Sequence, residues 1–258
     1  MPYLVWGGVS FVVWLVAYDN KFEGVVSTIV GIVNHKYLSI YWFFIPLFSI
    51  YLSIPVLAKL TDRIWSFRYM VVYGILSFFV LPFVCSLLHL QIDWQILSPL
   101  TGGGYIVYSL IGWLISEVKM TKKVVKIVYV LGIVGFLSQY FGTIFLSIPG
   151  GEINGYFKGY INWPCLFQSV ATFCLFKQIF NNDLKINAGI ISFVRKLQSL
   201  SLGCYLIHFY FIKFAFDYLG VKAASMTFRT LGAIFIFSVS CLIVFVIRKT
   251  KIGRILLP

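Results

Sequence analysis

Charge is scarce in this sequence, and negative charge is scarcer still. Only 11% of the 258 residues are charged, and eight Asp and Glu residues stand against 21 Lys and Arg residues. Soluble domains carry about a quarter charged residues, so this composition excludes a water-soluble globular protein. Apolar side chains replace the charged ones, because 60% of the residues are hydrophobic and 19% are aromatic. We conclude that most of this apolar surface faces lipid.

Paired cysteines are also absent. The five cysteines form no C-x-x-C pair, and each falls inside an apolar run. This pattern argues against a disulfide framework and a zinc site, which need cysteines at characteristic spacings. We therefore expect small core cysteines, no metal site and no bound cofactor. The cysteines are Cys85, Cys165, Cys174, Cys204 and Cys241.

The sequence lacks the alternation of polar and apolar residues that a membrane β-barrel requires. Apolar runs of about twenty residues recur instead, long enough to cross a hydrocarbon layer about 30 Å thick as helices. Residues 1–18 lack the basic start of a cleavable signal peptide, so we expect them to remain as the first span. We predict an all-α, polytopic membrane bundle of about eight helices that forms one domain over residues 1–258. The predicted spans are 3–18, 38–58, 69–89, 104–118, 127–148, 163–180, 201–219 and 228–247.

The basic residues lie mainly in the connections between these spans. Fifteen follow spans two, four, six and eight, whereas five follow spans one, three, five and seven. Insertion keeps positive charge on the cytoplasmic side, so we predict cytoplasmic termini in a multi-pass protein of the cell membrane. The net charge of +13 is not gathered on one face, so nucleic-acid binding is not expected. Topology alone explains the basic inner face, which would also suit an anionic donor as a landing surface.

The connections predicted to face outward mix aromatic residues with acidic and amide side chains. Residues 90–103 hold Asp93, and residues 149–162 hold Glu152. Such side chains could line a polar site for an acceptor. An aromatic belt at the membrane surface with ordinary turns is the simpler interpretation.

Ionisable side chains within a span are costly, so each one is a candidate for function. His208 lies about eight residues into the seventh span, roughly 12 Å from its cytoplasmic end. Cys204 and Tyr205 share its helical face. His208 is therefore either a catalytic base or a neutral ring that bonds a tyrosine or a carbonyl group on a neighbouring helix.

Other polar residues near the membrane have the same two interpretations. His35 and His89 fall at the outer boundary, where each could meet an extracellular substrate or simply contact water. Gln139 and Gln168 lie within spans, where side-chain amides usually bond one helix to another.

Three stretches resemble one family of membrane enzymes. The run Tyr41-Trp42-Phe43-Phe44-Ile45-Pro46-Leu47-Phe48, followed by Tyr51 and Pro55, resembles the early aromatic block of the acyltransferase 3 family. Ser201-Leu202-Gly203-Cys204-Tyr205-Leu206-Ile207-His208 is similar to the family's late S-x-x-x-Y-L-I-H element, and residues 163–180 resemble the helix before it. The order and spacing of these stretches match the family from its third transmembrane helix to its tenth.

This resemblance implies an enzyme that moves an acyl group, commonly acetyl, from a cytoplasmic coenzyme A thioester to a carbohydrate hydroxyl. The acceptor would be a surface polysaccharide, a lipid-linked precursor or a small molecule. A histidine would act as general base, and basic residues would hold the anionic donor. Donor-binding residues are not identified. The candidate catalytic residues are His208, His35 and His89, and the candidate substrate-binding residues are Tyr41, Trp42, Tyr205, Asp93 and Glu152.

The sequence also departs from the family pattern. Members usually carry two earlier helices with a catalytic histidine and an Arg-x-x-Arg pair, whereas this chain starts within the counterpart of the third helix and has no Arg-x-x-Arg. Ile40 stands where many members place a histidine. The resemblance thus implies a truncated gene, a split enzyme completed by a partner polypeptide, or an inactive relative. A transporter or flippase for a glycan or polar solute, and a membrane scaffold, are the alternative functions.

Overall fold

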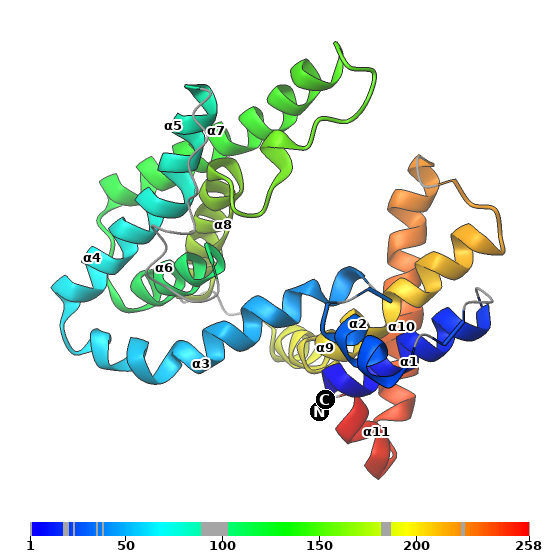
Figure 1. Cartoon of the computed structure of the whole chain (residues 1–258). Coiled ribbons are helices and arrows are strands. Elements are labelled where there is room, and N and C mark those ends of the chain that lie inside the picture. The colour runs from blue at the N-terminus through cyan, green and yellow to red at the C-terminus, as the bar shows by residue number, and fades with distance from the viewer. Residues whose placement is uncertain are drawn as a thin grey trace. The chain divides into compact units, whose positions relative to one another are not determined.

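The computed structural model, drawn in Figure 1, describes residues 2–17, 21–22, 24–34, 36–37, 39–88, 103–181, 187–222 and 225–257. Within these ranges every regular element is a helix, and none is a strand. The predicted all-α class is therefore confirmed. A helix suits an apolar environment because it pairs the backbone N–H and C=O groups within its own segment.

The described part of each predicted span lies mainly on a helical segment. Five segments are long and apolar enough to cross a membrane, namely Ser39–Thr61, Ile64–Leu87, Lys122–Ser147, Ala188–Asp217 and Phe228–Ile247. Leu4–Ala17 and Tyr105–Glu117 are apolar but shorter. The structure supports several spans, while the count of eight and the side of the termini stay predictions.

The chain divides into two compact units, and each is described by itself. Unit 1 comprises Met1–Phe44 and Lys185–Pro258, and unit 2 comprises Ile45–Leu184. The elements of unit 1 are α1 (Pro2–Ala17), α2 (Val25–Val33), the 3-10 helix η1 (Ser39–Phe43), α9 (Ala188–Asp217), the π-helix η5 (Phe228–Gly232), α10 (Ala233–Ile247) and α11 (Lys251–Leu256). Those of unit 2 are α3 (Phe44–Thr61, from its second residue on), α4 (Ile64–Ile75), the π-helix η2 (Leu76–Val80), α5 (Leu81–Leu87), α6 (Tyr105–Glu117), α7 (Lys122–Ser147), the 3-10 helix η4 (Tyr156–Lys158) and α8 (Trp163–Asn181).

Helix α9 is longer than the span predicted at 201–219. Its 30 residues start at Ala188, where the side chain of Asn187 caps the first turn by accepting from the backbone N–H of Gly189 at 2.7 Å. A helix of this length extends about 45 Å, more than a hydrocarbon layer of about 30 Å requires. Arg195 and Lys196, expected in a connection, therefore lie on the first half of this helix.

Unit 2 is built on two well-packed contacts. Its buried core joins α4, η2, α6 and α8, with the side chains of Phe67, Ile106, Val107 and Leu166 almost fully enclosed. The neighbouring pair α7 and α8 runs side by side in Figure 1. At Gly135 these two helices approach so closely that an added Cβ would lie 2.7 Å from the Pro164 carbonyl oxygen.

Polar side chains of unit 2 bond to one another or to the backbone. Gln168 Nε2 donates to Gln139 Oε1 at 2.7 Å, so the predicted helix-to-helix amide bond is confirmed. The Tyr129 hydroxyl donates to Gln178 Oε1 at 2.6 Å. Lys177 Nζ donates to the carbonyl oxygen of Ser116, 2.8 Å away, and to that of the preceding residue. Its charge thus lies at the carboxyl end of α6, where the helix dipole favours a cation.

Unit 1 holds both ends of the described chain together. The indole N–H of Trp6 on α1 donates to the carbonyl oxygen of Leu256 on α11 at 2.8 Å. Helix α1 also reaches α9, where the hydroxyl oxygens of Ser10 and Tyr210 lie 2.6 Å apart. The first and last helices therefore belong to one packed body.

Candidate functional site

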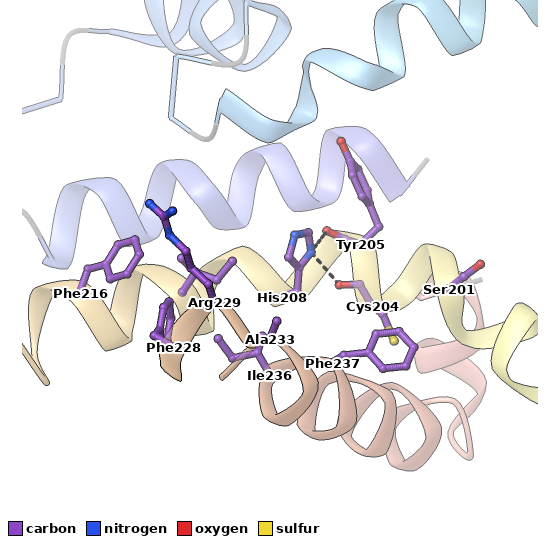
Figure 2. Close-up of a pocket in the computed structure, with 11 residues that line it drawn as sticks. Ser201, Cys204, Tyr205, His208, Phe216, Phe228, Arg229, Ala233, Ile236 and Phe237 are labelled. Carbon is purple, nitrogen blue, oxygen red and sulfur yellow. Dashed lines mark hydrogen bonds between the residues drawn. The ribbon is translucent and has the colours of Figure 1, made fainter. Parts of the chain in front are cut away.

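A cavity of about 490 Å³ lies between α9 and the paired segment η5–α10 (Figure 2). The two helices are close at one end, where the sulfur atoms of Cys204 and Cys241 are 3.2 Å apart. At the other end the rings of Phe216 and Phe228 meet with centroids 5.3 Å apart. These two contacts set an antiparallel register, and the cavity fills the space between them.

The walls of the cavity are mainly apolar. Helix α9 supplies Ser201, Cys204, Tyr205, His208, Ile212 and Phe216. The other wall consists of Phe228, Arg229, Ala233, Ile236 and Phe237. The sequence analysis did not single out Arg229, which enters the site from the π-helix η5. Short π-helical turns are frequent at functional sites and are not readable from hydrophobic periodicity.

His208 has a defined tautomer. Its Nδ1 lies 3.1 Å from the carbonyl oxygen of Cys204 and 2.9 Å from that of Tyr205, as the dashed lines in Figure 2 show. Carbonyl oxygens only accept, so Nδ1 of the neutral ring carries the hydrogen. Nε2 is then left with a lone pair, and it makes no hydrogen bond to any residue that the structure describes.

The predicted bond from His208 to a neighbouring helix is therefore not what the structure shows. The ring bonds carbonyl groups of its own helix, three and four residues back. This arrangement holds the imidazole in place while leaving one nitrogen available as a base. Figure 2 shows the side chains of His208 and Arg229 pointing to the same side of the cavity.

The start of the early aromatic block, within unit 1, is bonded to α9 beside this cavity. The buried Tyr41 donates its hydroxyl hydrogen to the carbonyl oxygen of Leu206 at 3.0 Å. Tyr205 returns a bond in the opposite direction, from its hydroxyl to the carbonyl oxygen of Ile40. The half-buried Trp42 packs edge-on against the ring of Phe43.

Unit 1 thus gathers four of the predicted site residues, Tyr41, Trp42, Tyr205 and His208. The hydroxyl groups of Tyr41 and Tyr205 each donate to a backbone carbonyl oxygen. Contact between these three aromatic residues and a substrate stays a prediction.

The remaining predicted site residues lie elsewhere. Glu152 is exposed in the connection between α7 and η4, within unit 2. His35, His89 and Asp93 lie outside the described residues.

Basic side chains collect at the end of unit 1 where α9 starts and α10 ends. Arg195 and Lys196 lie on one exposed face of α9 together with Ser192 and Ser199. The guanidinium of Arg248 reaches α9 and donates to the carbonyl oxygen of Ser199 at 2.5 Å. Two segments that are far apart in the sequence, the first half of α9 and the residue after α10, thus contribute positive charge to one end of the unit.

Comparison with family models identifies the chain. The model of the acyltransferase 3 family, described as an acyltransferase domain, matches residues 1–248. The chain belongs to the acyltransferase 3 family. The match covers residues of both units and the whole cavity between α9 and α10. With several apolar helices of spanning length, this acyltransferase 3 chain is a multi-pass membrane protein. Searches of the curated proteins and of the solved structures find no match.

Proposed function

We propose that this chain is an O-acyltransferase of the cell membrane. It moves an acyl group from a coenzyme A thioester to a hydroxyl of a surface polysaccharide or of its precursor. One observation carries the proposal: His208 lines the cavity with Nδ1 bonded and Nε2 without a hydrogen bond to any described residue, in a chain that belongs to an acyltransferase family.

His208 is the proposed general base. An acceptor hydroxyl that donates to Nε2 loses its proton to that atom as its oxygen attacks the thioester carbonyl carbon. A C–O bond forms and the C–S bond breaks, and the proton then passes from Nε2 to the departing thiolate. The two hydrogen bonds of Nδ1 keep the ring in one orientation throughout.

The basic end of unit 1 is the proposed donor side. Coenzyme A carries phosphate groups, and arginine and lysine bind phosphate oxygens strongly. Arg195 and Lys196 lie on an exposed face of the same helix that carries His208. Arg195 is thirteen positions before His208, which is about 20 Å along the helix and about 140° around it. That distance is comparable with an extended phosphopantetheine arm.

The acceptor is proposed to reach His208 from the outer side of the membrane, without passing along the apolar stretch between His208 and the Phe216–Phe228 contact. Charge sorting predicts that Phe216 and Arg229 lie toward the outer side of the membrane. Donor and acceptor would then meet at His208 from opposite sides.

Two substitutions of His208 separate a base from a packing role. His208→Ala removes both nitrogens, whereas His208→Asn keeps an N–H that can donate to the carbonyl groups of Cys204 and Tyr205 but provides no base. Both variants should lower kcat/KM for acyl transfer by about 100-fold or more, the range of general base catalysis. The measurement is transfer of labelled acyl groups to carbohydrate in membranes of cells that carry the native locus, where any partner polypeptide is present.

The matched control is Gln139→Leu, a polar residue on a helix of unit 2, which should leave transfer unchanged at equal protein level. Near-normal transfer by His208→Asn would show that the ring only fills space and would overturn the proposal. Solute flux into vesicles without any acyl transfer would support the transporter alternative instead.

A further inference from the structure

The part of the cavity that lies beyond His208, away from the basic end, is hydrocarbon. Ile212 and Phe216 form its wall on α9, and Phe228, Ala233 and Ile236 form the opposite wall. Arg229 lies near its far end. No hydrogen-bonding side chain of the described residues lines the stretch between His208 and Arg229. These walls suit an apolar group and not a carbohydrate, whose hydroxyls would lose their hydrogen bonds to water there.

The size of the cavity also indicates how long the acyl chain is. An acetyl group adds one methyl to the thioester carbonyl and would leave most of the 490 Å³ unfilled. A longer hydrocarbon chain would bury methylene groups against the phenylalanine rings, and each buried methylene strengthens binding about fourfold. The cavity therefore favours a donor whose acyl chain continues past the thioester.

We infer that this chain transfers an acyl group with a hydrocarbon tail longer than acetyl, and that the tail occupies the cavity between His208 and the Phe216–Phe228 contact. The inference rests on the proposed function and names its donor class. The thioester carbonyl lies at His208, the coenzyme extends toward Arg195 and Lys196, and the tail extends the opposite way. One helix, α9, thus carries a basic end for the anionic part of the donor and an apolar end for its tail.

The reaction is the one written above, with a longer tail on the same carbonyl. The C–S bond of the thioester breaks, the ester C–O bond forms, and the hydroxyl proton leaves with the thiol by way of His208. The tail is not altered, so no further reactant is needed.

A series of donors tests the tail length. Acetyl-, hexanoyl- and decanoyl-coenzyme A are compared in native membranes, with kcat/KM for transfer to carbohydrate as the readout. We expect decanoyl transfer to exceed acetyl transfer at least tenfold. Ala233→Phe narrows the cavity and should reduce decanoyl transfer at least tenfold while acetyl transfer changes little, and Ala233→Leu should act in the same direction if the larger ring prevents folding.

The matched control is Ile234→Phe, the next residue on α10, which is 65% exposed and lies outside the cavity. It should leave the chain-length profile unchanged. Equal or better transfer of acetyl, or equal effects of Ala233→Phe and Ile234→Phe, would overturn the inference. If the tail of a membrane lipid is the sole occupant of the cavity, transfer will not rise with the length of the acyl chain.

Failure of the proposed function gives a different result. If no donor supports transfer, the purified protein is titrated with thioether analogues of acetyl- and decanoyl-coenzyme A, which bind but do not react. At least tenfold tighter binding of the decanoyl analogue, lost in Ala233→Phe, would support the tail site without the reaction. Equal binding of both analogues would reject it.

Discussion

Two helix pairs of this protein differ in how closely their helices pack. In unit 2, α7 and α8 close on each other through Gly135, and their polar side chains bond across the interface. In unit 1, α9 and α10 touch at the Cys204–Cys241 end and the Phe216–Phe228 end, and they leave a cavity between.

The two helix pairs also differ in the hydrogen-bond partners of their polar side chains. Gln139, Gln168 and Tyr129 of the closed pair each direct a polar atom at a partner on the facing helix. His208 of the open pair bonds only its own helix through Nδ1, and its side chain lines the cavity. A polar residue inside a membrane domain is therefore a guide to function when its geometry leaves an atom available, and a guide to packing when it does not.

The closed pair should tolerate no added volume. A side chain at Gly135 would meet the Pro164 carbonyl oxygen at 2.7 Å and Phe167 Cβ at 3.1 Å, and neither backbone nor Cβ can move cheaply. Gly135→Leu should lower the free energy of unfolding by about 3 kcal/mol, at the upper end of overpacking effects. The change is measured by heating the variant and the unaltered protein in detergent and comparing the fraction of each that stays folded.

The control for this prediction is Gly112→Leu on α6, where an added Cβ meets nothing within 4 Å. It should be neutral or slightly stabilising, because leucine has a higher helix propensity than glycine. Similar losses for both variants would mean that α7 and α8 do not pack as closely as described.

The length of the apolar runs explains how much of this fold the sequence predicts. Each apolar run became a helical segment, because the cost of unpaired backbone groups in lipid leaves few alternatives. The start of α9 at Ala188 was missed, since residues 188–200 contain Arg195 and Lys196 and so resemble a connection. An amphipathic extension of a spanning helix has the composition of an interfacial segment, and hydropathy alone cannot separate the two.

The candidate site was only partly predictable for a related reason. His208 stood out because a histidine within a span is costly, and the resemblance drew attention to Tyr41, Trp42 and Tyr205. Arg229 did not stand out in the sequence, because the turn that brings it into the cavity wall is π-helical. The approach of Arg248 to the basic face of α9 depends on a contact between distant segments, its hydrogen bond to Ser199, which one sequence does not reveal.

Lys177 gives the next test of the closed unit, with a smaller effect. Its ammonium group donates to two carbonyl oxygens at the end of α6, and hydrogen bonds to charged groups contribute about 1.5–3 kcal/mol. Lys177→Met keeps the aliphatic stem but removes the charge, so the free energy of unfolding should fall by about 2 kcal/mol. The exposed Lys126 on α7 offers a matched Lys→Met control that should change stability little.

Breaking the amide pair should have the smallest effect on stability. In contrast to substitution of His208, it should leave acyl transfer unchanged. Gln168→Leu leaves Gln139 without its partner on α8, and bonds between membrane helices contribute about 0.6 kcal/mol on average. Replacing both glutamines by leucine should recover part of that loss, because no buried amide is then left unpaired. Acyl transfer per folded molecule should equal that of the unaltered protein in both variants. A drop in transfer comparable with that of His208→Asn would mean that the closed pair also takes part in the chemistry, and the distinction between the two helix pairs would fail.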